Sequence, residues 1–328
     1  KVEQKLNDGV GMPWLVSGLT RAAALEVPKL SGQSVYGGSP TDQSVVEAIK
    51  ALNDAGKAVT FYPFLLMEQL ADNTLPNPWT DESGQPPLPW RGRITLNKAP
   101  GQPGSSDRTA AAAVEVASFF GTVESAHFAI VGETVIYTGP VEWSYRRFIL
   151  HYAHLCKAAG GVAAFCIGSE MRALTQVRAA GDSFPTVTAL RQLASEVRAI
   201  LGGQTKISYA ADWSEYFGYH VGDNVYFHLD PLWADPAIDF IGIDNYMPVS
   251  DWRDGEAHAD AHWGGLHNTA YLQANIAGGE GFDWYYANAT GAAAQIRLPI
   301  SDGAHGEPWV FRVKDLRGWW SSSHHNRI

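Results

Sequence analysis

Several residue types and patterns are scarce in this 328-residue chain, and each scarcity excludes a class of protein. The chain has two cysteines, Cys156 in an expected helix and Cys166 in an apolar strand, so buried thiols are favoured over a disulfide. No signal-peptide pattern occurs, and no apolar run is long enough to span a bilayer. Lys and Arg form no cluster, and the formal net charge of -10 argues against nucleic acid or an anionic membrane as main partner.

Three catalytic or cofactor motifs are also missing. No Gly-rich phosphate loop follows the early strands, which disfavours a dinucleotide-binding sheet, and no Gly-x-Ser-x-Gly elbow is present, which disfavours acyl transfer. His258 and His262 have i,i+4 spacing, but the intervening Asp260 does not make the His-Glu-x-x-His pattern of a zinc site. We therefore interpret these residues as surface or loop histidines and expect neither a metal nor a cofactor.

The patterns that are present alternate between amphipathic helices and strands that are apolar on both faces. Such alternation is typical of parallel βαβ units covered by helices, so the fold class is α/β, either a closed barrel or an open doubly wound sheet. The polar and aromatic residues that follow each strand, and the missing phosphate loop, favour a (β/α)8 TIM-barrel-like fold. We expect helices over 41–56, 109–121, 142–159 and 185–201, strands over 58–67, 162–167, 206–211 and 238–243, and a hairpin of 127–131 with 134–137.

We interpret residues 1–328 as a single domain. Residues 1–40 form an irregular segment with the apolar stretch 12–16, and residues 74–108 and 247–328 are expected insertions or loops. The chain starts at Lys1 without methionine and stops abruptly at Ile328, so it reads as a fragment of a longer protein.

Glu170 is the best catalytic candidate. It follows an apolar strand at the carboxyl end, where barrel active sites lie, and Gly168 and Ser169 before it allow close approach of the backbone. Cleavage of a glycoside requires one carboxylic acid to protonate the leaving oxygen and a second carboxylate about 5–9.5 Å away. A partly desolvated glutamate would have the raised pKa that such an acid needs. The alternative is a structural carboxylate, paired with Arg172 or placed at a helix N-terminus.

Asp212 and Asp244 occupy equivalent positions after the next two strands. Either residue would orient substrate hydroxyls or neighbouring catalytic groups, and either would equally cap the following turn. Tyr246 would hydrogen-bond a catalytic carboxylate or simply pack on the loop rim. The chain is also rich in aromatic residues, with 12 Trp, 13 Tyr and 13 Phe, and exposed rings such as Trp213 would pack on the C–H faces of sugars. Core packing is the alternative for each ring.

A Gly-rich stretch at 277–286 is expected to lie as a loop over the cleft. It offers Glu280 and Asp283 beside the ring of Trp284. Glu280 is the fallback for the second carboxylate, and Asp283 and Trp284 are expected to contact substrate.

At these residues the sequence resembles a known family, the glycoside-hydrolase TIM-barrel-like domain of gene transfer agents and related phage tails. That domain belongs to a large tail-tip protein, often called a host-specificity or megatron protein. The similarity extends from about residue 30 to the end. The motifs that carry it are FCIGSEMR at 165–172, YAADWSEY at 209–216, FHLDPLW at 227–233, GIDNYMP at 242–248, DWRDG at 251–255 and GGEGFDWYY at 278–286.

The resemblance implies a barrel related to retaining glycosidases, with an acid/base glutamate after strand four and a nucleophile glutamate after strand seven. Glu170 matches the first position. The family strand that carries the nucleophile follows a Trp-Trp-Ser stretch, here 319–321, and the chain ends before it. We therefore expect an incomplete barrel that lacks its first and last strands, with the nucleophile outside this chain.

The resemblance also implies a setting. The domain would act on or recognise cell-envelope polysaccharide or peptidoglycan at the tail tip of a virion-like particle that is made in the bacterial cytoplasm and released. Its partners would be other tail-tip or hub proteins, and it would be a homotrimer in the assembled tail. The alternative function is a non-catalytic carbohydrate-binding or structural module of the tail hub, because fold alone does not establish activity.

Overall fold

The computed structural model describes residues 6–7, 10–11 and 14–328, so Met12 and Pro13 of the expected apolar stretch lie outside the described residues. The chain divides into two compact units, which we describe separately. Unit 1 comprises residues 1–211 and 228–242, and unit 2 comprises residues 212–227 and 243–328.

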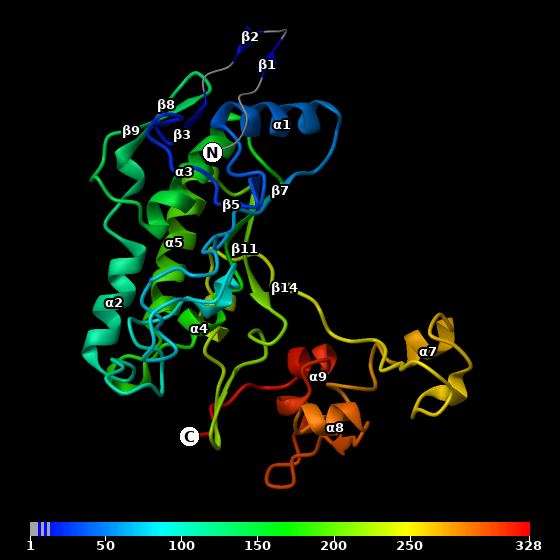
Figure 1. Cartoon of the computed structure of the whole chain (residues 1–328). Helices are drawn as coiled ribbons and strands as arrows, with labels where there is room; N and C mark the ends of the chain where they lie inside the picture. The colour runs from blue at the N-terminus through cyan, green and yellow to red at the C-terminus, as the bar shows by residue number, and fades with distance from the viewer. Residues whose placement is uncertain (1–5, 8–9, 12–13) are drawn as a thin grey trace. The chain divides into compact units, whose positions relative to one another are not determined.

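A four-stranded sheet forms the centre of the fold, with the strand order β14-β11-β10-β7 (Figure 1). Strand β10 pairs in parallel with both β11 and β7. The parallel α/β arrangement predicted from the sequence is therefore confirmed, although the described strands do not close into a barrel. The bounds are β7 Thr60–Phe61, β10 Ala164–Ser169, β11 Lys206–Asp212 and β14 Gly242–Asp244.

The helices of unit 1 cover this sheet. Helix α3 packs beside α5 and α1, and α5 also contacts α2 and β10 (Figure 1). The predicted helices are confirmed to within a few residues. Capping residues in the sequence indicated where helices begin: the Thr41 side chain, for example, accepts a hydrogen bond from the Ser44 N–H at 3.0 Å. The bounds are α1 Asp42–Asp54, α2 Ala110–Phe120, α3 Tyr145–Ala158, α4 Arg172–Thr175, α5 Pro185–Leu201 and α6 Asp230–Trp233.

Two predicted strands differ from the structure. Residues 58–67 were expected to form one strand, but β7 is only two residues long, because Pro63 has no N–H for a ladder and Phe64 and Leu66 after it are exposed. The strand expected at 238–243 begins at Gly242 instead. Before that point the Asp239 side chain accepts the Ile207 N–H at 2.8 Å, so a carboxylate replaces a backbone partner there.

The remaining elements of unit 1 are short. The expected hairpin is confirmed as β8 and β9, with Gly132 and Glu133 in its turn. Among the described residues of segment 1–40, which was expected to be irregular, three antiparallel pairs of two-residue strands occur. The cysteines are buried thiols as predicted. The bounds are β1 Leu6–Asn7, β2 Val10–Gly11, β3 Leu15–Val16, β4 Leu19–Thr20, β5 Lys29–Leu30, β6 Gln33–Ser34, β8 Phe128–Val131, β9 Thr134–Tyr137, and the 3-10 helices η1 Arg91–Arg93, η2 Ser125–His127 and η3 Ala180–Asp182.

Unit 2 contains small hairpins, short helices and long connections. A single Gln295 side chain, for example, donates to both the backbone carbonyl and the carboxylate of Asp251. The bounds are β12 Tyr219–Val221, β13 Asn224–Tyr226, α7 Thr269–Ala274, β15 Trp284–Tyr285, α8 Ala289–Ala293, β16 Leu298–Pro299, α9 Leu316–Ser321, and the 3-10 helices η4 Ala261–Trp263 and η5 Pro308–Phe311.

The core of unit 1 gives a first prediction. Leu190 of α5 is fully buried, so Leu190→Ala should lower the free energy of unfolding by about 2–5 kcal/mol, because it removes buried methyl groups and leaves a cavity. The matched control is Leu52→Ala in α1, where Leu52 is exposed. Urea unfolding followed by circular dichroism measures both, and equal losses would contradict the placement of the core.

Candidate functional site

Glu170 lies immediately after β10, at its carboxyl end. Its backbone N–H donates to the Ala210 carbonyl at 2.9 Å, and the residue is only 5% exposed. The glycine expected to permit close approach does so, because a Cβ on Gly168 would lie 2.7 Å from the Tyr145 hydroxyl oxygen and 3.0 Å from the Tyr209 ring. The strand and its aromatic neighbours thus fix the position of the carboxylate.

The backbone of Glu170 adopts a left-handed conformation, with φ of 47°. A bulky L-residue pays a steric cost in this region, which favours Gly and Asn. Such strain persists only when the surroundings determine the conformation, and it gathers at functional sites. The observation therefore supports a functional role for this residue, a signal that the sequence alone does not contain.

Two donors converge on one oxygen of Glu170. The indole Nε1–H of Trp90 donates to Oε2 at 2.7 Å, and Nη2 of Arg91 lies 2.9 Å from the same oxygen. The Arg91 side chain is also largely buried, so this ion pair is screened little by solvent. The structural alternative considered for Glu170 involved Arg172, and the structure shows an ion pair of Glu170 with Arg91.

Arg91 is held in turn by its surroundings. Its Nη2 donates to the Ser169 hydroxyl at 2.8 Å, and its guanidinium carbon lies 4.7 Å from the centre of the Phe64 ring. The Tyr62 hydroxyl hydrogen-bonds the same Ser169 side chain. The carboxylate of Glu170 therefore has a fixed orientation, as a catalytic or binding group requires.

Trp90 and Arg91 were not identified from the sequence. Both lie in the segment 74–108, expected to be an insertion, and 80 residues separate Trp90 from Glu170. One local signal is Gly92. A Cβ at this position would lie 2.4 Å from atoms of the Trp90 ring, so the absence of a side chain at Gly92 lets the indole pack against the backbone there. Trp90 remains 38% exposed while its N–H reaches the carboxylate.

The other predicted site residues belong to unit 2, where Asp212 shapes a turn. Its Oδ1 accepts from the Ser214 N–H at 2.8 Å, and its backbone carbonyl accepts from the Glu215 N–H at 2.8 Å. The capping role considered for Asp212 is therefore present. The carboxylate of Glu215, which is fully buried, accepts the Asp212 N–H at 3.1 Å and was not singled out from the sequence.

Trp213, Asp244 and Tyr246 form the rest of this region. Trp213 is half-buried, and its N–H donates to the Asp244 carbonyl at 3.1 Å. Tyr246 is 72% exposed. Their predicted roles toward a substrate remain predictions.

The Gly-rich loop closes on itself. Asp283 Oδ2 accepts the Gly279 N–H at 2.8 Å, which is a structural contact, and Trp284 carries the Arg297 guanidinium 4.2 Å from its ring centre. Glu280 is half-buried, and burial together with the nearby Asp251 charge raises its pKa, against the opposing effect of Arg253. A raised pKa suits a proton donor better than the ionised second carboxylate for which Glu280 was the fallback, and that role stays a prediction.

A buried lysine braces this loop. Lys314 is 5% exposed, and its Nζ donates to the carbonyls of Pro248 and Gly278, each at 2.7 Å. Burial lowers the pKa of Lys314 to about 8, although Glu280 and Asp283 act in the opposite direction. The buried ammonium group of Lys314 therefore links the loop that contains Gly278 to the segment that contains Pro248.

Asp251 is the centre of the polar network in unit 2. Its carboxylate is contacted by Arg253 and Arg297, each at 2.7 Å, and by the Tyr286 hydroxyl at 2.5 Å. Arg297 also pairs with Asp260 at 2.8 Å. Asp251 lies in one of the family motifs, yet its place as a hub was not predicted, because its partners Tyr286 and Arg297 are 35 or more residues distant.

Neither a metal site nor a membrane span is found in the part of the chain that the structure describes. The described residues hold no group of three or more His, Cys, Asp or Glu side chains that could bind a metal ion. In the same residues, no helix combines the length and the apolar character needed to cross a bilayer.

Comparison with protein families gives one match. The sequence model described as GTA TIM-barrel-like domain matches residues 143–328, more than half of the chain, including Glu170 and every other predicted site residue. A search of curated proteins finds no match.

The Asp251 network predicts a pH dependence. Burial raises the pKa of Asp251, but hydrogen bonds from Tyr286, Arg297 and Gln295 outweigh it, so the net pKa is lowered. A carboxylate with a lowered folded-state pKa stabilises the protein above its unfolded pKa of about 4, and this contribution disappears as the pH falls through the folded value.

We therefore expect Asp251→Asn to destabilise the protein near neutral pH and to weaken the loss of stability on acidification. Thermal unfolding from pH 7 down to pH 3 (about the range of carboxyl titration) measures the effect. The matched control is Asp254→Asn, an exposed aspartate nearby. A variant and wild type with parallel pH profiles would show that the network does not carry this stability.

Proposed function

Because the chain belongs to the GTA TIM-barrel-like domain family, we propose that it is a glycoside-hydrolase-like tail-tip domain that acts on cell-envelope glycan, with Glu170 as its acid/base carboxylate. The single observation that carries this proposal is the constrained carboxylate of Glu170. It combines a strand-end position, a left-handed backbone and convergent donors.

In this proposal the two oxygens of Glu170 have different tasks. Arg91 and the Trp90 indole can only donate hydrogen bonds, so Oε2 is held as an acceptor. A proton exchanged with the glycosidic oxygen would therefore be carried by Oε1. Arg91 would then stabilise the carboxylate that remains after the proton has left.

Exposed rings near Glu170 support a carbohydrate substrate. Trp90 is 38% and Phe64 is 50% exposed, and both contact the Arg91–Glu170 pair. Aromatic faces pack on the apolar C–H faces of pyranose rings, as the sequence analysis proposed for the aromatic residues in general. A glycan bound across these rings would present its linkage oxygen to the carboxylate.

A second function, a non-catalytic carbohydrate-binding or structural module, is favoured by the same ion pair. Arg91 suits an ionised carboxylate, and an ionised carboxylate accepts hydrogen bonds from sugar hydroxyls without protonating a leaving group. In this alternative the residues around Glu170 bind glycan and do not cleave it. The two functions share the ligand and differ in the chemistry.

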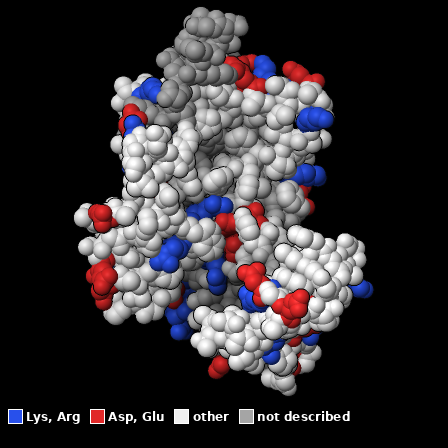
Figure 2. All heavy atoms as spheres, turned by 45° about the vertical axis from the view of Figure 1, so that its right-hand side comes forward, with Lys and Arg blue, Asp and Glu red and all other residues white. Residues whose placement is uncertain are grey.

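The biological setting is part of the proposal. Polysaccharide or peptidoglycan of the cell envelope would be the ligand, and other tail-tip or hub proteins in a homotrimeric assembly would be the partners, at the tail tip of a released particle. Acidic and basic side chains are interspersed on the face in Figure 2. This distribution supports a glycan better than a polyanion, which would require a broad basic field.

Glu170→Gln tests the assignment. It should abolish the release of reducing ends from purified bacterial envelope glycans, because the amide cannot supply a proton, while circular dichroism shows an unchanged fold. The matched control is Glu196→Gln, which alters a carboxylate paired with Arg146 at 2.6 Å elsewhere in unit 1. Cleavage by Glu170→Gln would contradict the catalytic role of Glu170. Glycan binding without cleavage by wild type and by both variants would support the second function.

Trp90→Phe tests the indole contact. The change keeps an aromatic ring but removes the N–H that donates to Oε2. Hydrogen bonds to charged groups contribute about 1.5–3 kcal/mol, so kcat/KM for glycan cleavage should fall about 10- to 100-fold. Trp79→Phe is the control, because its indole N–H donates to the Arg93 carbonyl instead. Equal activities of Trp90→Phe and wild type would exclude a role for this hydrogen bond.

A further inference from the structure

Unit 1 contains a small cavity, of about 170 Å³, next to the candidate site. Trp90 belongs to its wall, and the indole N–H of the same residue donates to Glu170 Oε2 at 2.7 Å. Sites that hold a whole small molecule measure about 300–1,000 Å³, so this cavity suits one substituent of a larger ligand. A ligand that contacts Glu170 would have the cavity beside it, with one indole ring between them.

The wall of this cavity is largely apolar. Met67 and Pro89 contribute side chains without polar hydrogen atoms. The Gln85 amide also lies in the wall, but it accepts a hydrogen bond from the Gln69 side chain and donates to the Pro76 carbonyl, each at 2.7 Å. These contacts leave the selection of a polar substituent to other residues of the wall.

Among the described residues that line the cavity, Arg93 alone carries a charge. Its guanidinium carbon lies over the Trp79 ring, 5.1 Å from the ring centre. In the described part of the chain this guanidinium has neither an ion-pair partner nor a hydrogen-bond acceptor, and the residue is half-buried. None of its nitrogen atoms is among the unpaired polar atoms that are closed to solvent, so a ligand can reach them.

The charges at this cavity favour an anionic group. Arg91 and Glu170 compensate each other as an ion pair at 2.9 Å, whereas the positive charge of Arg93 is uncompensated among the described residues. A guanidinium that covers an aromatic ring presents its N–H groups at its edges, in the plane that matches the two oxygens of a carboxylate. Trp79 acts on the guanidinium, and a phenyl ring at this position would do the same.

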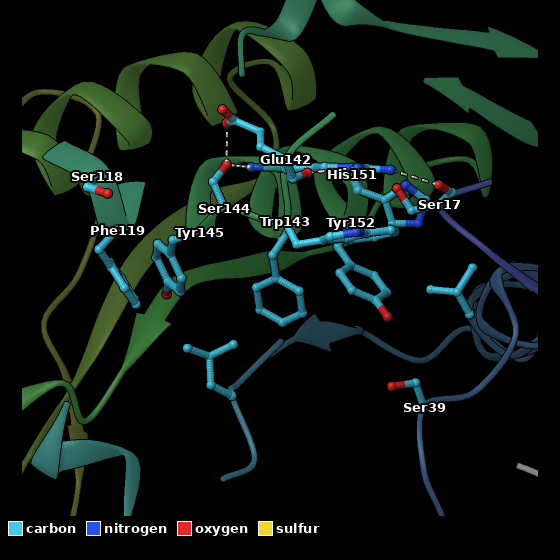
Figure 3. A pocket seen from close by; sticks show the side chains of 14 residues that line it. Ser17, Ser39, Ser118, Phe119, Glu142, Trp143, Ser144, Tyr145, His151 and Tyr152 are labelled. Carbon is cyan, nitrogen blue, oxygen red and sulfur yellow. Dashed lines mark hydrogen bonds between the residues drawn. The ribbon is translucent and has the colours of Figure 1, made fainter. Parts of the chain in front are cut away.

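A larger cavity of unit 1 has no comparable selectivity. It has a volume of about 540 Å³ and lies beside α3, with the rings of Tyr145 and Tyr152 along it (Figure 3). Its wall contains both an acidic and a basic residue, Glu142 and Arg147. The Arg147 guanidinium already donates to the Glu142 and Ser17 carbonyls, at 2.7 and 3.2 Å. We therefore assign no ligand to this larger cavity.

We propose that the cavity at Arg93 binds the carboxylate of an acidic sugar, such as a uronate or a lactyl ether, in the glycan that reaches Glu170. This assignment rests on the function proposed above, because the cavity shares Trp90 with the Glu170 site. Arg93 is then the residue that selects acidic over neutral glycans. Lys and Arg form no cluster in the sequence, so single carboxylates fit better than a run of negative charges.

The test is the binding of matched sugars that differ by a carboxylate. The probes are methyl glucuronide against methyl glucoside, and N-acetylmuramic acid against N-acetylglucosamine, with dissociation constants from NMR titration at millimolar concentrations. Wild type should bind the acidic member of at least one pair about 5- to 10-fold more tightly, as one partly exposed charged contact allows. Raising the salt from about 0.01 M to about 1 M should weaken this preference, because the Debye length shortens from about 30 Å to about 3 Å.

Substitutions of Arg93 test its role directly. Arg93→Gln should equalise the affinities for the two members of each pair, and Arg93→Lys should retain part of the preference, because the charge stays while the planar fork is lost. Circular dichroism should show that Arg93→Gln folds, since the guanidinium has no ion pair among the described residues. The matched control is Arg317→Gln, which removes the same charge at an exposed position of unit 2 and should keep the preference.

Several outcomes would overturn the inference. These are failure of all four sugars to bind, equal affinities of wild type within both pairs, and a preference that survives in Arg93→Gln. Stronger competition by inorganic phosphate than by acetate at equal ionic strength would contradict the choice of a carboxylate.

Cleavage of envelope glycans by wild type separates this inference from the function proposed for Glu170. Cleavage without any preference for acidic sugars would support the role of Glu170 and overturn the inference. A preference that depends on Arg93, in a protein that cleaves no glycan, would contradict the catalytic role of Glu170 and support the inference.

Discussion

The ion pair between Arg91 and Glu170 is the interaction on which the candidate site depends. Both side chains are largely buried, and a buried charge is costly unless an opposite charge and hydrogen bonds compensate it. The pair joins η1, in an otherwise irregular segment, to the end of a central strand. Loss of either partner would leave the other charge uncompensated, so the order of the segment and the orientation of the carboxylate are coupled.

The sequence predicted the fold where local physics determines it. Helix α1 begins at Asp42 because Thr41 caps it, and α5 runs over 185–201 as expected from its apolar periodicity and Pro185. The prediction failed where a single residue overrides a pattern. Pro63 interrupts an apolar run that was expected to be one strand. The Asp239 carboxylate takes the place of a backbone acceptor for the Ile207 N–H. A hydrophobicity pattern shows neither effect.

The candidate site was predictable only in part. Glu170 was identified because strand ends in α/β folds carry functional groups, a rule that needs the sequence order alone. Its partners Trp90 and Arg91 were missed, because contacts across some 80 residues leave no periodic signal. For Asp212 the sequence left function and turn formation open, and the structure shows its turn contact. Asp283 was expected to contact substrate, and the structure shows a turn contact for it as well. Capping and catalysis use the same residue types, so only coordinates separate them.

The left-handed backbone at Glu170 has a consequence for which residues this position tolerates. Judged by conformation alone, glycine would be preferred there, since a side chain in this region costs of order 1–2 kcal/mol. Glycine and the short side chain of asparagine would both forfeit the contacts that the longer glutamate makes with the indole and the guanidinium. The chain therefore retains glutamate against its local conformational preference. The contacts of the Glu170 side chain, and not the conformation of its backbone, therefore determine which residue suits this position. The rest of the fold must compensate for the conformational energy of the left-handed backbone.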